Sequence, residues 1–232
     1  MLVLGIESAT TQVGCAIGGH EGVLASAHSS RAKRHAEILT PQIDFVRRQA
    51  RIELREIGVV AVDLGPGLFT GLRVGIASAM AIAHALTVPM IGVASLDLLA
   101  FPVRFTSKLI VAAIDARRGE LFHAFYRPVP GGVQRVSDYE VSSPDDLASE
   151  ILARSEDCLV VGDGVLRYHE VFDGLRKVEL ADFGFAYPNA ASLVQLAHAQ
   201  ALREQWVKPW EITPLYLRKP DIDINWATRD TK

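Results

Sequence analysis

The run from Gly65 to Gly75 constrains the fold of this chain more than any other segment. Its four glycines and one proline lie between a hydrophobic stretch, 59–64, and an alanine-rich stretch, 76–86. This order predicts a buried strand, a tight turn and the start of a helix. Glycine lets other atoms approach the backbone closely, and a helix N-terminus presents free N–H groups that suit phosphate. The run therefore predicts either a closely packed turn or a phosphate-binding loop, although it lacks the Lys-Ser/Thr of a P-loop and the spacing of a dinucleotide fingerprint.

Short apolar stretches separated by turns precede this run. They predict three antiparallel strands, at residues 2–6, 13–17 and 23–27. The turn after the first stretch carries Glu7 and Ser8, which offer a carboxylate and a hydroxyl. Residues 33–55 follow with a periodicity that predicts a helix, and Pro41 should start or kink this helix. Residues 72–86 predict the helix after the glycine run.

A second set of elements with the same plan begins near Pro102. Residues 109–114 and 121–126 predict two strands joined by a charged turn, and helices and a further buried strand follow. Two such units side by side predict a duplicated α/β protein with a cleft between its halves. We place the halves at 1–103 and 104–208, followed by a polar tail at 209–232.

Composition narrows the class of protein. The 232 residues are 49% hydrophobic and 22% charged, as in an ordinary globular chain, and the net charge of −3 argues against binding nucleic acid through the chain's own charge. The two cysteines, Cys15 and Cys158, are too far apart for a zinc knuckle or a disulfide framework. The N-terminus lacks the basic region of a signal peptide, and no apolar stretch reaches about 18 residues. We therefore expect a cytoplasmic protein without a membrane segment.

Few residues are candidates for chemistry. Glu7 and Ser8 with Gly65, Gly67 and Gly71 are candidates for a phosphate site, because acids hold Mg²⁺ through water and backbone N–H groups hold phosphate. A turn with local hydrogen bonds is the alternative. The seven histidines contain no pair at helical ligand spacing, and no Gly-x-Ser-x-Gly elbow is present. We therefore expect no metal site and no catalytic residue.

Taken together, these segments resemble the TsaB (YeaZ) family. The most specific matches are residues 65–75 and 115–120, the second of which reads Asp-Ala-Arg-Arg-Gly-Glu. Further matching segments occur in the family's order at 6–8, 15–17, 35–43, 89–97, 162–164, Pro188 and 214–218. Two positions depart from the family, since Glu7 stands where Asp is commoner and Leu68 replaces the usual Ser. Both changes point toward the catalytic paralogue TsaD. The second histidine of that paralogue's His-x-x-x-His metal motif is, however, absent after His35.

The resemblance implies a duplicated actin-like, Hsp70-like fold of the ASKHA, ribonuclease H-like type. It also implies a non-catalytic scaffold subunit of the complex that forms N6-threonylcarbamoyladenosine at position 37 of tRNAs reading ANN codons. The implied partners are TsaD, which this subunit binds and activates, and the ATPase TsaE, with tRNA reached only through the complex. The chain would require no cofactor of its own. ATP or ADP at the interface with partners, and a homodimer of the free chain, are left open.

The resemblance further implies that the helix after the glycine run forms part of the dimer surface. Small residues at spacing four let two helices approach closely, and their apolar neighbours would supply contacts if the stripe is exposed. The candidates for the partner interface are Leu72, Gly75, Ile76, Ala79, Met80 and Ala83. Packing of the stripe inside its own domain is the alternative.

Two other functions stay open at this point. An independent actin-like ATPase or phosphotransferase would use Glu7, Ser8 and the glycine loop for the phosphates, with Asp115 near the metal. The second unit is short for the usual adenosine pocket, which argues against that function. A peptidase would need a metal or an activated nucleophile, and the histidine pattern supplies neither.

Overall fold

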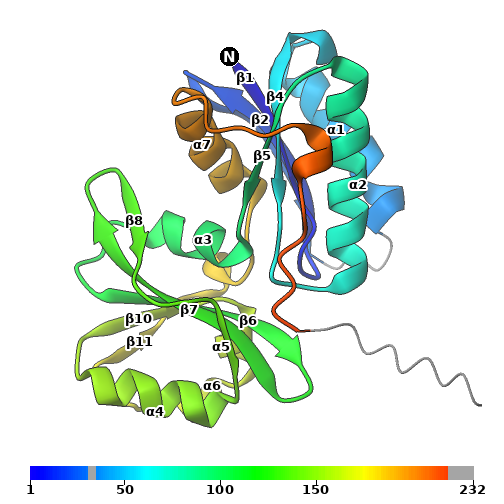
Figure 1. Cartoon of the computed structure of the whole chain (residues 1–232). Helices are drawn as coiled ribbons and strands as arrows, with labels where there is room; N and C mark the ends of the chain where they lie inside the picture. Colours follow the sequence, from blue (N-terminus) through cyan, green and yellow to red (C-terminus); the bar gives the residue numbers. More distant parts are fainter. Residues whose placement is uncertain (31–34, 219–232) are drawn as a thin grey trace, which may run out of the picture.

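The structure is a computed structural model that describes residues 1–30 and 35–218. Figure 1 shows two α/β units, one above the other, each built around one sheet. The upper unit contains the N-terminus and the glycine run. The lower unit contains the middle of the chain, and the C-terminal segment returns from the upper unit to the boundary between the two.

The first sheet has five strands in the order β3-β2-β1-β4-β5. They are β1 (Leu2–Glu7), β2 (Val13–Gly19), β3 (Gly22–Ser29), β4 (Ile57–Asp63) and β5 (Met90–Val93). The first three are antiparallel neighbours, as predicted, whereas β4 and β5 join β1 in parallel. Strands β1 and β4 are covered on both faces, which is why they read as nearly continuous apolar runs.

The second sheet repeats this order. Its strands are β6 (Leu109–Arg117), β7 (Glu120–Val129), β8 (Gly132–Arg135), β9 (Glu140–Ser142), β10 (Cys158–Val161) and β11 (Val178–Leu180). Read from the other edge, the order β8-β7-β6-β10-β11 matches β3-β2-β1-β4-β5, with two antiparallel and two parallel pairings, and β9 adds to β7. The predicted duplicated actin-like α/β fold is therefore confirmed.

Helices cover both faces of each sheet. On the first sheet, α1 (His35–Ala50) and α2 (Phe69–Leu86) pack on one face and α7 (Ala190–Ala201) on the other. On the second sheet, α3 (Ser95–Ala100) packs on one face, and α4 (Pro144–Arg154), α5 (Asp163–Arg167) and α6 (His169–Phe172) pack on the other. Short 3₁₀ turns lie at Leu54–Glu56, Phe101–Val103, Phe183–Phe185 and Pro209–Glu211.

The predicted unit boundaries need correction, because the chain exchanges a helix between the units. Helix α3 falls in the predicted first half yet packs on the second sheet, and α7 falls in the second half yet packs on the first sheet. Residues 209–218 are not a free tail, since Ile212 is buried in the first core and Leu215 N–H donates to Leu64 O at 2.7 Å. The rest of the predicted tail, 219–232, lies outside the described residues.

The two N-terminal helices also differ from prediction at their ends. Helix α1 begins at His35 and ends at Ala50, with Pro41 inside it rather than at its start, and the predicted positions 33–34 lie outside the described residues. Helix α2 begins at Phe69, three residues before the predicted start. By length and composition α2 would suit a membrane span, which corrects the expectation that no stretch is long enough. Its inner face instead packs against β4 and α1, as core helices do.

Candidate functional site

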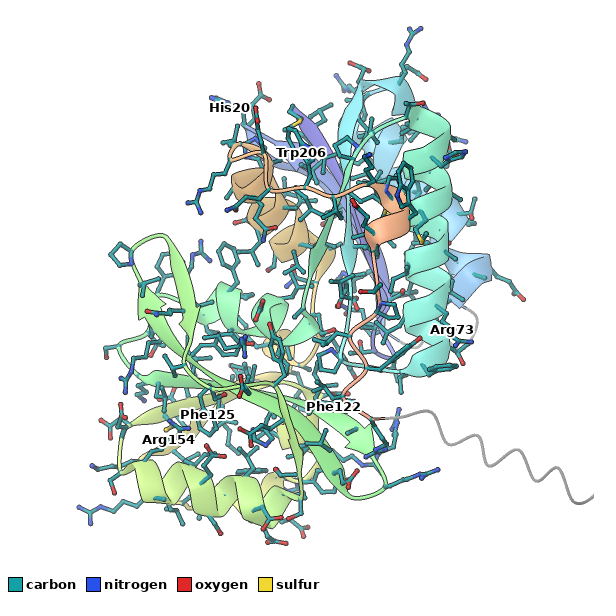
Figure 2. All side chains as sticks on the ribbon, viewed as in Figure 1. His20, Arg73, Phe122, Phe125, Arg154 and Trp206 are labelled. Atoms are coloured by element: carbon teal, nitrogen blue, oxygen red, sulfur yellow. The ribbon has the colours of Figure 1, made fainter. Side chains whose placement is uncertain are left out.

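The residues singled out for chemistry gather where the two units meet. The β1–β2 turn and the loop after β4 come from the first unit, and the β6–β7 turn and the start of α5 come from the second. Figure 2 shows Phe122 of β7 near this boundary and Arg73 close to the beginning of α2. The topology explains the gathering, because in each unit the carboxyl ends of two parallel central strands point at the junction.

Each unit places a pair of acidic residues at that edge. Glu7 ends β1 and Asp63 ends β4, and the register that sets Ile6 opposite Val62 brings the two acids side by side. In the second unit Asp115 near the end of β6 and Asp163 after β10 hold the equivalent positions. The fold thus repeats its acidic positions along with its strands.

Glu7 and Asp63 are almost completely buried. Glu7 Oε1 accepts from Ala9 N–H at 2.9 Å, and Asp63 Oδ1 accepts from Gly65 N–H at 2.7 Å and Ser95 Oγ–H at 2.6 Å. Burial raises the pKa of Glu7 well above its usual value, with a further contribution from Asp63, and burial raises the pKa of Asp63 to about 7. Both acids therefore act as caps of tight turns, and Gly65, at φ +97°, supplies the backbone that the second turn requires.

The glycine loop packs directly on the β1–β2 turn. Leu68 N–H donates to Ala9 O at 2.6 Å, and Ser8 Oγ–H donates to Gly71 O at 2.9 Å. A Cβ atom at Gly67 would lie 2.1 Å from Ala9 O, and one at Gly71 would lie 2.2 Å from Ser8 O. The glycines are therefore required by this contact between two backbone segments. The two loops that would face a phosphate from opposite sides touch each other instead.

Charged groups of the second unit line the other side of the junction. Asp115 Oδ2 contacts Arg117 Nη1 at 2.9 Å and Arg167 Nε at 3.5 Å, and Asp115 N–H donates to Asp163 Oδ1 at 3.0 Å. Burial raises the pKa of Asp163 to about 6. The carboxylates and guanidinium groups of this turn thus bond to one another and to the backbone.

The space at the junction divides into a closed part and an open part. Between the β1–β2 turn, Leu68, Asp115 and Asp163 lies a cavity of about 10 Å³, enough for one water molecule. Beside it, an open pocket of about 410 Å³ is lined by the glycine loop, the β6–β7 turn and residues 215–218. None of the five predicted phosphate residues lines the closed part, whereas Gly67 lies on the wall of the open part, which is the larger of the two spaces.

The five phosphate candidates, Glu7, Ser8, Gly65, Gly67 and Gly71, therefore come together. Ser8, Gly67 and Gly71 make contacts between the two loops, whereas Glu7 and Gly65 bond within their own turns. The interface candidates need a correction. Helix α2 turns Leu72, Gly75, Ile76, Ala79 and Ala83 into the core of its own domain, and Met80 is partly buried. The condition that the stripe be exposed is not met, because this face of α2 packs on strand β4 and a Cβ at Gly75 would meet Ser8 Oγ at 2.1 Å.

Two features of the site carried no clear sequence signal. The C-terminal segment packs against the start of α2. The centroids of the Phe69 and Tyr216 rings are 5.3 Å apart, and Arg73 Nε donates to the Tyr216 hydroxyl at 3.3 Å. Arg218 pairs with Glu120 and donates to Ala116 O, which ties the same segment to the second unit. In the sequence, Tyr216-Leu217-Arg218 belongs to a segment that matches the family and lies in a polar tail, but nothing there indicates these contacts.

Comparison with known proteins adds the family context. The family model described as "TsaD: tRNA N6-adenosine threonylcarbamoyltransferase" matches residues 22–226. The uncharacterized protein ML0378 of Mycobacterium leprae is 37% identical over 95% of this chain, and the chain spans 55% of that relative's length. The tRNA threonylcarbamoyladenosine biosynthesis protein TsaB of Escherichia coli is 27% identical over 94% of this chain and 95% of its own length.

A solved structure agrees with these relatives. YeaZ from Pseudomonas aeruginosa superposes with a TM-score of 0.80 at 25% identity, covering 93% of this chain and 99% of that one. The agreement extends over both units rather than over one of them.

Proposed function

Since the chain belongs to the TsaB (YeaZ) family of tRNA threonylcarbamoyladenosine biosynthesis proteins, we propose that it is the non-catalytic scaffold subunit of its complex. In this role it binds and activates a TsaD-type partner that forms N6-threonylcarbamoyladenosine at position 37 of tRNAs reading ANN codons. A TsaE-type ATPase joins the pair, and tRNA is reached only through the complex. The proposed compartment is the cytoplasm.

The observation that carries the non-catalytic role is the closed junction. An actin-like ATPase needs room for phosphate between the β1–β2 turn and the glycine loop, yet here Leu68 N–H and Ser8 Oγ–H bridge those two segments. The cavity that remains, about 10 Å³, has room for about one water molecule. The same contacts argue against an independent ATPase or phosphotransferase.

The cofactor part of the proposal follows from the same geometry. The chain requires no nucleotide for itself, and ATP or ADP would bind only where partners meet it. The open pocket of about 410 Å³ supports this arrangement, because Arg117, Arg118 and Arg218 lie on its wall and guanidinium groups suit phosphate.

The proposed partner surface is the outer face of α2. Because the inner stripe is buried, the outward positions are Arg73, Ala77, Ala81 and Ala85, one turn apart along the helix. Neighbouring α1 adds Phe45, whose side chain is 53% exposed. Small side chains at spacing four let a partner helix approach closely, and an exposed aromatic ring supplies apolar area beside it.

A reconstitution tests this proposal. The TsaD-type and TsaE-type homologues are assayed for tRNA threonylcarbamoylation with and without this chain, and the chain alone is assayed for Mg-ATP turnover. The proposal predicts no turnover by the chain alone and modification that depends on adding it. Turnover by the chain alone, or full modification without it, would contradict the scaffold role.

A further inference from the structure

Three potential metal ligands meet in the second unit, away from the junction. One ring nitrogen of His123 and a carboxylate oxygen from each of Glu140 and Glu150 lie within 4.8 Å of one another. They come from three different elements, since His123 is on β7, Glu140 on β9 and Glu150 on α4. The register of β7 and β9 sets His123 directly opposite Glu140, so the strand pairing itself fixes two of the three.

The hydrogen bonds of His123 leave one nitrogen without a partner. Ser142 Oγ lies 3.2 Å from Ser143 O and 2.9 Å from His123 Nε2, so the hydroxyl can give its proton to Ser143 O and accept from the ring. In that arrangement the imidazole carries its proton on Nε2 and a lone pair on Nδ1. Among the described residues Nδ1 has no hydrogen-bond partner, although the His123 side chain is only 1% exposed.

An unpartnered lone pair on a buried side chain calls for a donor or a cation. A metal-binding histidine typically donates its other N–H to an acceptor, and Ser142 Oγ is placed to be that acceptor.

The charges around the cluster favour a cation. Glu150 Oε1 accepts from Arg154 Nη2 at 2.7 Å, and the Arg154 guanidinium lies 3.9 Å from the centre of the Phe125 ring. Figure 2 shows Arg154 and Phe125 together on the α4 side of the sheet. One guanidinium thus faces two carboxylates, which leaves a net negative charge. Glu140 is exposed, so an ion can enter from solvent.

We propose that His123, Glu140 and Glu150 bind a divalent transition-metal ion, with Zn²⁺ as the probe. One imidazole nitrogen and two carboxylate oxygens are ligand types that Zn²⁺ accepts in four-coordinate sites, and water completes the coordination. The bound ion ties β9 and α4 to β7, so its role is to stabilise the second unit. The site is independent of the scaffold role. Histidine spacing along the chain does not reveal this cluster, because its three residues come from separate elements.

The proposal is tested by calorimetric titration of the full chain with ZnCl₂. The chain is first treated with a chelator and dialysed. The variants are Glu140→Gln and Glu150→Gln, and the matched control is Asp138→Asn, which removes the same charge two positions from Glu140 on a side chain that is 97% exposed. The wild type and the control are expected to bind one Zn²⁺ per chain. Each glutamine variant is expected to weaken the Kd at least tenfold.

Thermal unfolding with and without ZnCl₂ gives a second readout, because an ion that binds only the folded chain raises Tm. The expected rise is present in the wild type and the control and lost in Glu140→Gln, an exposed position at which substitution leaves the fold intact. No Zn²⁺ binding by the wild type would overturn the proposal. Binding that is equally tight in Glu140→Gln would also overturn it and would assign the ion to exposed histidines elsewhere.

Discussion

Replacing Gly71 by alanine tests the packing that closes the junction. The added Cβ would lie 2.2 Å from Ser8 O and 3.5 Å from His35 Nε2, whereas ordinary contacts begin near 3.4 Å. The Ser8 backbone or the start of α2 must therefore move by about 1 Å. Overpacking of this kind costs about 1–3 kcal/mol. Weakening the bond from Ser8 Oγ–H to Gly71 O adds about 1 kcal/mol.

Helix propensity offsets part of that cost. Alanine is about 1 kcal/mol more favourable than glycine inside a helix, and Gly71 is the third residue of α2. The net loss is then about 1–3 kcal/mol. For a chain of this size each kcal/mol lowers Tm by about 2–4 °C, so Gly71→Ala is expected to lower Tm by about 2–12 °C.

Thermal unfolding followed by circular dichroism measures the effect. The matched control is Gly184→Ala, because a Cβ there would meet nothing within 4 Å. Its Tm should stay within about 1 °C of the wild type. A Gly71→Ala chain with unchanged Tm would refute the reasoning. It would mean that the β1–β2 turn and the glycine loop leave a space between them, as a phosphate site requires.

Three further predictions concern buried groups. Burial raises the pKa of Asp63 to about 7, above its unfolded value of about 3.9, so the stability it contributes is present at low pH and lost as the pH rises through 7. Asp63→Asn should remove that loss. The Tm of the variant, relative to that of the wild type at the same pH, should therefore increase between about pH 5 and pH 8. A Tm difference that stays constant over this range would contradict the assignment. Ala79 is fully buried, so Ala79→Arg should unfold the chain or leave it insoluble, and a soluble variant with wild-type Tm would show that the α2 stripe is exposed after all. Cys15 and Cys158 are both buried, and burial raises the pKa of Cys15 to about 12, so a disulfide reagent should label neither thiol in the folded chain and both after denaturation.

The sequence predicted the strands and the duplication well because those depend on local patterns. Strand β1 and strand β4 are buried on both faces, so their apolar runs are unambiguous, and the glycine run could only connect a strand to a helix. The side-by-side placement of Glu7 and Asp63 was not predicted, because it depends on the parallel register of β1 with β4.

The sequence did not predict which surface each helix covers. The periodicity of α3 and α7 shows a buried face, but a buried face packs equally well on either sheet, so their exchange between the units was missed. The small-residue stripe of α2 suits close packing against a sheet or against a partner, and the pattern alone does not distinguish them. The cluster at His123 depends on the register of β7 with β9 and on the placement of α4, which are tertiary facts.

The most direct test of the scaffold role is size-exclusion chromatography with light scattering on this chain mixed with its TsaD-type homologue. The comparison includes Ala81→Arg, at an exposed position of α2, and Ala153→Arg, at an exposed position of α4 in the other unit. The scaffold role predicts a one-to-one heterodimer for the wild type and for Ala153→Arg, and its loss for a still-folded Ala81→Arg chain. A wild-type chain that elutes separately from its homologue at tens of micromolar would contradict it.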